Sequence, residues 1–193
     1  MSQRAKWNAR YASAELPTAQ QACEVLRRNT ELLPEQGRAL DLACGLGANA
    51  LLLAEHGLKV QAWDLADTAL EKLQAAASQG NLAAALSTVQ RDAETQPPEP
   101  SSFDVIVVSH FLHRPSLPAL AQALRPGGLL FYQTFNRDKP AGGPGNPDFL
   151  LEPGELLAVF SSLQLRFYQE YGRTGDQQYG NRHETLFVGQ APR

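Results

Sequence analysis

The chain has 193 residues, a hydrophobic fraction of 43% and a formal net charge of −3 at pH 7, which fits one domain spanning 1–193. The slightly acidic balance excludes the strong basic field that attracts nucleic acid or an anionic membrane. No apolar run approaches the roughly 18 residues of a membrane span, and the N-terminus lacks the apolar core of a signal peptide, so we expect a cytoplasmic protein. Cys23 and Cys44 are too far apart for a CxxC motif, so we expect neither a disulfide framework nor a metal site.

Runs typical of buried strands alternate with runs of helical periodicity from residue 18 to residue 135. Helices are expected at 18–29, with Thr18 as a candidate N-cap, and at 48–56, 67–79 and 117–124. Strands are expected at 38–43, 58–63, 85–90, 103–109 and 129–135, and a turn at 125–128. This alternation predicts βαβ units and a parallel sheet.

The C-terminal part has a different pattern. Two strand-like runs, 163–170 and 184–190, are separated by a polar stretch without helical periodicity. They predict an antiparallel hairpin added to the parallel sheet. The expected fold class is therefore α/β: a doubly wound, mostly parallel, seven-stranded sheet with a C-terminal antiparallel hairpin. Residues 1–36, before the first strand, are expected to form an N-terminal helical cap.

One long connection follows the fifth predicted strand. Residues 136–150 contain three prolines and three glycines. Loops of this length in compact domains are typical of lids and binding loops, or else of mobile connections. Both interpretations of 136–150 stay open: a lid over a ligand site, and a mobile surface segment.

A glycine turn follows the first predicted strand, where Gly45 and Gly47 open a helix. Glycine allows the backbone to approach a ligand closely, and the amide groups of the helix start face the same place. An acid lies on or just after each of the first three strands: Asp41, Asp64 and Asp92. These carboxylates suit, in that order, an ammonium group, a ribose diol and an adenine amino group. S-adenosylmethionine carries all three groups and no phosphate.

Other interpretations of these residues stay open. Nicotinamide and flavin domains use a similar glycine turn, although they place a pyrophosphate at the helix start, where the charge of Asp41 would be unfavourable. Each acid taken alone is also typical of a solvated loop or a helix cap.

The stretch LDLACGLGANALLLAEHGLKVQAWD, at 40–64, resembles the glycine-rich motif and the ribose-binding acid of the class I S-adenosylmethionine-dependent methyltransferases. RDAE at 91–94, FDVIVVSHFLHR at 103–114 and LRPGGLLFYQTF at 124–135 are similar to later motifs of that family. Within it, the chain is most similar to the tellurite-resistance methyltransferases, through GANALLLAEHG, KWNARYA at 6–12 and EPGELLAVF at 152–160. The resemblance covers most of the chain and implies a Rossmann-like methyltransferase fold.

The resemblance also implies roles for individual residues. S-adenosylmethionine would lie over the glycine turn, with its ribose on Asp64 and its adenine near Leu65, Asp92 and Ala93. Arg10 and Tyr11 would close over it, and Ser109 and His110 would lie near its carboxylate or its methyl group. The cofactor-binding set expected is Arg10, Tyr11, Asp41, Gly45, Gly47, Asn49, Asp64, Leu65, Asp92, Ala93, Ser109 and His110.

Two features depart from the family pattern. Cys44 replaces the middle glycine of the motif, and we interpret it as a packing residue. The tellurite-resistance group carries a His-Arg pair before a Gly-Asn-Arg, whereas here Arg173 has no preceding histidine and only the Gly-Asn-Arg ending at Arg182 is kept. This departure weakens the case for an oxyanion substrate.

Methyl transfer is an in-line displacement that needs an aligned nucleophile and the exclusion of water. A base is needed only when the acceptor arrives protonated. The candidates for catalysis or acceptor contact are His113, Arg114 and Arg182. Alternatively, His113 is a packed or capping histidine and the two arginines are ordinary surface charges.

The sequence therefore predicts methyl transfer from S-adenosylmethionine to a small molecule, with S-adenosylhomocysteine as the product. The acceptors expected are soft nucleophiles such as thiols and selenium or tellurium species, or other small metabolites. The alternatives are an S-adenosylmethionine-binding module without catalysis and an NAD(P)-dependent oxidoreductase. The sequence carries no prediction of the oligomeric state.

Overall fold

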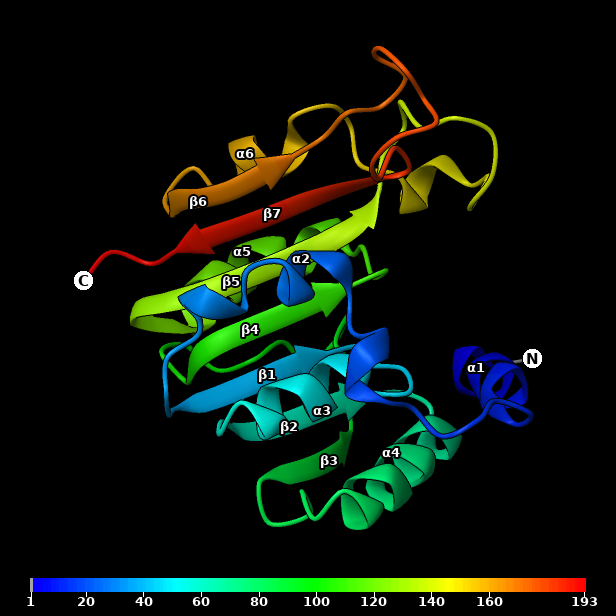
Figure 1. Cartoon of the computed structure of the whole chain (residues 1–193), viewed down its shortest axis with the longest axis vertical. Helices are drawn as coiled ribbons and strands as arrows, with labels where there is room; N and C mark the ends of the chain where they lie inside the picture. The colour runs from blue at the N-terminus through cyan, green and yellow to red at the C-terminus, as the bar shows by residue number, and fades with distance from the viewer. Residues whose placement is uncertain (1) are drawn as a thin grey trace.

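The computed structural model describes residues 2–193. It contains a central seven-stranded sheet in the order β3-β2-β1-β4-β5-β7-β6 (Figure 1). The strands are β1 (Arg38–Leu42), β2 (Lys59–Asp64), β3 (Leu86–Gln90), β4 (Phe103–Ser109), β5 (Leu124–Phe135), β6 (Gln164–Gln169) and β7 (Glu184–Gln190). Strands β1 to β5 pair in parallel, and β7 runs antiparallel to both β5 and β6. The predicted fold class is confirmed.

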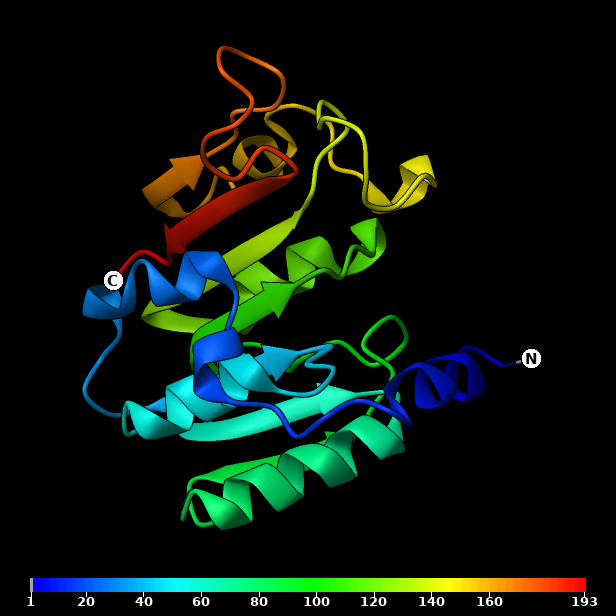
Figure 2. The same ribbon diagram turned by 45° about the vertical axis from the view of Figure 1, so that its right-hand side comes forward.

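Helices cover both faces of this sheet (Figures 1 and 2). The helices are α1 (Gln3–Tyr11), α2 (Glu24–Arg27), α3 (Ala48–Glu55), α4 (Asp67–Gln79), α5 (Leu117–Ala123) and α6 (Glu155–Val159). Alternate residues of β4 point to opposite faces: Val105 and Val107 pack in the core layer of α2, α3 and α4, whereas Ile106 and Val108 pack in the layer of α5 and α6. The four side chains are fully buried, which explains the continuous apolar run in this strand.

The helix expected at 18–29 is divided in two, which corrects that prediction. A 3-10 turn, Ala19–Gln21, precedes α2, and Ala22 between them is extended, with ψ of 152°. The N–H of Cys23 donates to Asn49 Oδ1 (2.8 Å) on α3 instead of continuing a helical ladder. Thr18 is the N-cap of the 3-10 turn, and its N–H donates to Gln21 Oε1 (2.9 Å).

The turn expected at 125–128 lies within β5. Leu124 already pairs with Phe103, and the register then shifts so that Leu129 pairs with Val105. The extra residues form a bulge, and Gly127 supplies the positive φ (78°) that the bend requires.

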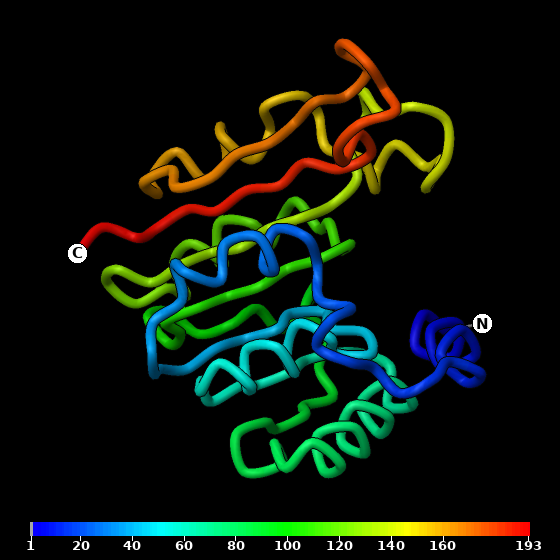
Figure 3. Tube along the Cα trace, in the orientation of Figure 1, coloured from blue at the N-terminus to red at the C-terminus, as the bar shows by residue number. Residues whose placement is uncertain are grey.

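The carboxyl ends of the parallel strands meet at one edge of the sheet, toward the right of Figure 1. Helix α1 and the segment 136–150 lie at this edge, whereas the C-terminus lies at the opposite one (Figure 3). A bridge between Asn136 and Leu151 joins the two ends of that segment. Within residues 2–193 the structure contains no helix with the length and apolar character of a membrane span.

Candidate functional site

The turn between β1 and α3 contains three residues with left-handed backbone: Ala43 (φ 53°), Gly45 (φ 53°) and Gly47 (φ 80°). A Cβ at Gly47, the N-cap of α3, would overlap the side chain of Leu73. A Cβ at Gly45 would lie 2.8 Å from the hydroxyl oxygen of Tyr11. Glycine is therefore needed at both positions, and the turn brings main-chain amides to the edge where doubly wound sheets bind ligands.

Asp64, at the end of β2, faces this turn. Its Oδ2 accepts a hydrogen bond from the Gly45 N–H (2.7 Å), and its Oδ1 accepts one from the Ala66 N–H (2.8 Å). Burial raises the pKa of Asp64, although these hydrogen bonds act in the opposite direction. The structure thus brings together the acid predicted to hold the ribose and the turn predicted to pass under the cofactor.

Asp41 has a different environment, because it lies beneath the turn with no exposed surface. Its Oδ1 accepts from Asn49 Nδ2 (3.3 Å) and its Oδ2 accepts from the Ala50 N–H (3.0 Å). Burial raises its pKa to about 7, and the nearby charge of Asp64 adds to this effect. Asp41 therefore orients the start of α3, and its predicted contact with an ammonium group stays a prediction.

The three residues predicted to surround the adenine lie after β2 and β3. Leu65 and Asp92 are half-buried, and Ala93 packs in the core layer of α5. The Asp92 side chain accepts from the Glu94 N–H (3.0 Å), and Gln90 Nε2 donates to the carbonyl oxygen of Leu65 (3.2 Å). The ends of the two strands are thereby joined, and these residues form the far side of the site from β4.

Helix α1 lies beside the glycine turn and has no buried residue. Tyr11 approaches the turn, and burial together with the charge of Asp64 raises its pKa to about 12. Arg10 turns its guanidinium over the ring of Trp7, 5.4 Å from the ring centroid. Of the two residues predicted to close over the cofactor, only Tyr11 lies against the turn in this structure.

Asn49 connects the turn to the end of β4. Its Nδ2 donates to Ser109 Oγ (3.1 Å) as well as to Asp41, and its Oδ1 accepts from Cys23. The side-chain polar groups of Asn49 are thus engaged inside the protein. The predicted contacts of Asn49 and Ser109 with the cofactor stay predictions, but the structure places both residues between the turn and β4.

His110, directly after β4, belongs to a polar cluster that the sequence did not reveal. Its Nε2 lies 2.6 Å from Glu184 Oε1, and Glu184 Oε2 accepts from the side-chain amides of Gln133 and Asn181. Burial alone would raise the pKa of Glu184, but the hydrogen bonds from His110, Asn181 and Gln133 hold it below its usual value. One signal was available: Gln133 is an amide directly after the apolar run 129–132 of β5, and it is buried.

The three predicted catalytic residues each form hydrogen bonds within the protein. His113 Nδ1 lies 3.1 Å from Ser116 Oγ. Arg114 forms a bidentate pair with Glu155 (2.7 and 2.9 Å) and donates to the carbonyl oxygens of 148 and 150. Arg182 donates to three carbonyl oxygens in the loop before β7. These hydrogen bonds engage the guanidinium groups of both arginines, so a catalytic role for either arginine stays a prediction.

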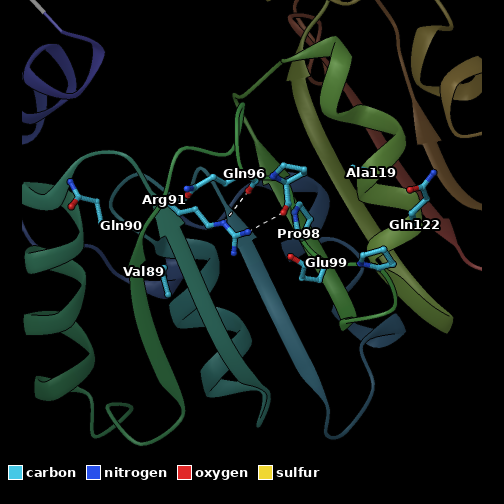
Figure 4. Close-up of a pocket in the computed structure, with 10 residues that line it drawn as sticks. Val89, Gln90, Arg91, Gln96, Pro98, Glu99, Ala119 and Gln122 are labelled. Atoms are coloured by element: carbon cyan, nitrogen blue, oxygen red, sulfur yellow. Dashed lines mark hydrogen bonds between the residues drawn. The ribbon is translucent and has the colours of Figure 1, made fainter.

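A surface hollow of about 630 Å³ lies elsewhere, between the end of β3 and α5 (Figure 4). It is lined by the proline-rich segment 96–100, and Arg91 donates across it to the carbonyl oxygens of Gln96 (3.0 Å) and Pro97 (3.1 Å). None of the residues predicted to bind the cofactor lines this hollow. The glycine turn and the ends of β2, β3, β4 and β5 therefore remain the candidate site.

Comparison with known proteins agrees with this geometry. A family described as methyltransferase domain matches residues 39–128. The ubiquinone biosynthesis O-methyltransferase of Idiomarina loihiensis is 34% identical over 108 residues, which cover 52% of this chain and 43% of that protein. The protein of the same name from Paracidovorax citrulli is 34% identical over 167 residues, 73% of this chain and 68% of that protein.

The chain spans about half the length of most of the curated relatives it matches. Among solved structures, TehB from Haemophilus influenzae is similar in fold, with a TM-score of 0.67 at 23% identity, over 87% of this chain and 61% of that chain. The relative from Paracidovorax citrulli adds sequence identity across two thirds of its own length. On these grounds the chain belongs to the class I S-adenosylmethionine-dependent methyltransferases, as its motifs predict.

Proposed function

We propose that this protein transfers the methyl group of S-adenosylmethionine to a small molecule held over the carboxyl ends of β4 and β5, leaving S-adenosylhomocysteine. The observation that carries the proposal is the hydrogen bond from the Gly45 N–H to Asp64 (2.7 Å). It fixes an acid at the end of β2 beside a turn in which Gly45 and Gly47 have left-handed backbone. The sheet order reverses between β1 and β4, and ligands of doubly wound sheets bind at that reversal.

The residues present fit this cofactor. S-adenosylmethionine is cationic at sulfur and at its amino group, and it has no phosphate. Two carboxyl groups, Asp41 and Asp64, lie under and beside the turn, and burial raises the pKa of both. A bound cation would stabilise their ionised forms, whereas the pyrophosphate of NAD(P) would meet the same charges unfavourably.

When bound, the cofactor supplies a methyl group activated by a positively charged sulfur. The chain then has to hold the acceptor in line with that methyl group and keep water away. Tyr11 on α1 and the segment 136–150 frame the edge where both ligands would lie, and the lid interpretation of that segment is part of this proposal. The cytoplasmic location and the absence of a nucleic-acid partner also stay predictions.

Two classes of acceptor compete. The resemblance to the tellurite-resistance group favours a soft nucleophile, but Arg173 is paired with Asp138 (2.9 Å) and Arg182 is bound to carbonyl oxygens. All three nitrogens of the Arg182 guanidinium are therefore engaged, whereas Arg173 uses only its Nε on Asp138 and its side chain is 66% exposed. The names of the ubiquinone biosynthesis relatives specify O-methyltransferases, which favours a hydroxyl group as the acceptor.

The first experiment measures the binding of S-adenosylhomocysteine and of NADPH by titration calorimetry. We expect S-adenosylhomocysteine to bind and NADPH not to bind; the reverse would favour the oxidoreductase alternative. The second incubates the protein with methyl-labelled S-adenosylmethionine and a panel of catechol, a small thiol, selenite and tellurite. Donor binding without transfer to any acceptor would instead support the non-catalytic module.

A further inference from the structure

His110 and Glu184 form a paired histidine and carboxylate at the acceptor side of the site. His110 Nε2 lies 2.6 Å from Glu184 Oε1, and the two side chains are 50% and 11% exposed. The His110 ring packs against Phe135, the last residue of β5, with ring centroids 5.2 Å apart. Three strand ends therefore meet here: β4 through His110, β5 through Phe135 and β7 through Glu184.

The backbone holds His110 in a conformation that costs energy. Its φ of 54° is left-handed, a region that residues other than glycine adopt only at a steric cost. Its N–H donates to the carbonyl oxygen of Gln133 (2.9 Å), so β5 holds the strained residue in place. Phe135 pairs with Glu184 in the register of β5 and β7, which brings the carboxylate to the same end of the sheet. Backbone strain of this kind is concentrated at functional sites.

The cluster also fixes which ring nitrogen carries the proton. Glu184 Oε2 is already engaged by Gln133 and Asn181, so Oε1 acts as the acceptor for an Nε2–H of His110. Among residues 2–193, no side chain or backbone group forms a hydrogen bond with His110 Nδ1. That nitrogen therefore keeps its lone pair on a half-exposed ring, as in a histidine oriented by a carboxylate for proton transfer.

Further charged groups lie behind the pair. Asn181 Nδ2 also lies 3.1 Å from Glu24 Oε2, and the other oxygen of Glu24 is paired with Arg28 (2.9 Å). Arg28 offsets the charge of Glu24. The carboxylate in direct contact with the His110 ring is Glu184.

We infer that His110 is the general base of the reaction, that Glu184 is its positioning residue, and that the acceptor is a hydroxyl group that arrives protonated. This inference rests on the proposed function. The acceptor O–H gives its proton to His110 Nδ1 while an oxygen lone pair forms the new C–O bond. The C–S bond breaks with its electron pair passing to sulfur. The resulting imidazolium is paired with Glu184 until its proton passes to water.

A general base accelerates methyl transfer to a protonated hydroxyl group, but not to a thiol that is already ionised. A phenol or alcohol is mostly protonated near neutral pH and gains from a base in the transition state, typically 10²–10⁴-fold. A thiolate is already a nucleophile and needs none. The histidine and carboxylate pair thus supports the hydroxyl class over the soft nucleophile expected from the sequence.

The kinetic experiment uses catechol and S-adenosylmethionine with the wild type, His110→Gln and Glu184→Gln. The control is His56→Gln, because His56 caps the other end of α3. We expect kcat to fall at least 100-fold in His110→Gln, less in Glu184→Gln, and not in His56→Gln. We also expect added imidazole to restore part of the activity of His110→Gly. Unchanged kcat in His110→Gln would overturn the inference. So would the loss of S-adenosylhomocysteine binding in that variant, since the histidine would then belong to the donor site.

A second readout does not depend on activity. Nitrogen-15 NMR of labelled histidines should find the His110 proton on Nε2 in the wild type and a mixture of tautomers in Glu184→Gln. A proton on Nδ1 in the wild type would contradict the assignment. The two proposals fail differently: a wild type that binds the donor but methylates no acceptor defeats the proposed function. A wild type that methylates thiols and not catechol defeats only the role of His110.

Discussion

The hydroxyl group of Tyr11 covers Gly45: a Cβ added to Gly45 would lie 2.8 Å from the Tyr11 oxygen. An N-terminal helix without buried residues thus reaches the centre of the glycine turn. The contact joins two segments 34 residues apart, and it places a side chain that the resemblance assigns to the cofactor next to the backbone that would carry it.

Gly45→Ala should weaken the binding of S-adenosylhomocysteine about tenfold or more. The substitution combines the cost of a left-handed backbone, about 1–3 kcal/mol, with displacement of Tyr11. Titration calorimetry measures the affinity. Gly175→Ala is the control, because Gly175 has φ of 72° and no heavy atom within 4 Å of an added Cβ. Gly175→Ala should lower the free energy of unfolding but keep the affinity for S-adenosylhomocysteine. Equal affinities of the two variants would contradict a role of the contact between Tyr11 and Gly45 in binding.

Asp64→Ala should weaken the binding of S-adenosylhomocysteine by about 1–3 kcal/mol, the usual cost of losing a charged hydrogen-bond partner. The substitution also removes the acceptor of the Gly45 and Ala66 N–H groups. Urea unfolding of the free protein separates the two effects. A loss of affinity no greater than that of Asp92→Ala, with the same change in unfolding, would argue against a special position for Asp64.

Asp41 should make the free protein less stable as the pH rises from about 4 to about 7. Burial raises its folded pKa from 3.8 to about 7, so the folded state binds the proton more tightly than the unfolded chain in this window. The free energy of unfolding should fall by up to about 4 kcal/mol across it. Urea unfolding of the wild type and of Asp41→Asn, which does not titrate, should therefore diverge with pH. A constant difference between the two would rule this out.

Arg114→Ala should expose the segment 136–150 to proteolysis. Arg114 holds the end of that segment through the carbonyl oxygens of 148 and 150 and through Glu155. We expect limited proteolysis to cut the segment several-fold faster in the variant. Arg125→Ala is matched to it, because the Arg125 side chain is equally exposed (39%) and pairs with Asp104, away from the segment. Equal cleavage rates in Arg114→Ala and Arg125→Ala would show that the Arg114 contacts do not hold the segment.

Asp67→Asn should weaken the attachment of α1 to the start of α4. Arg4 and Asn8 both donate to the Asp67 carboxylate, and the hydrogen bond from Arg4 is the main cause of its lowered pKa. A lowered pKa means that this contribution is present above the unfolded pKa and is lost as the pH falls through the folded one. The protection of the amides at 3–11 from hydrogen exchange, measured relative to the unfolded chain at the same pH, should fall in the variant and in acid. Glu71→Gln on the same helix as Asp67 should leave the protection of 3–11 unchanged. An equal loss of protection in Glu71→Gln would contradict the role of the Asp67 contacts.

Local patterns were sufficient to predict much of the fold. The strand at 103–109 and the helix at 67–79 have the expected limits, because a strand buried on both faces is a continuous apolar run and an amphipathic helix repeats its apolar residues every three or four positions. The glycine turn was equally predictable, since glycine adopts a left-handed backbone without the steric cost that other residues meet. These properties depend on near neighbours along the chain.

The tertiary structure alone decided which polar groups meet. Glu184 contacts His110 across 74 residues, and Asn49 draws the N–H of Cys23 out of the helix expected at 18–29. Arg114 and Arg182 have the chemistry of anion-binding residues, but Arg114 binds Glu155 and the carbonyl oxygens of 148 and 150, and Arg182 binds carbonyl oxygens of the loop before β7. Sequence spacing cannot specify such partners, because a buried polar group takes whichever partner the packed strands bring within hydrogen-bond distance, and an unpaired one would cost more than any local preference.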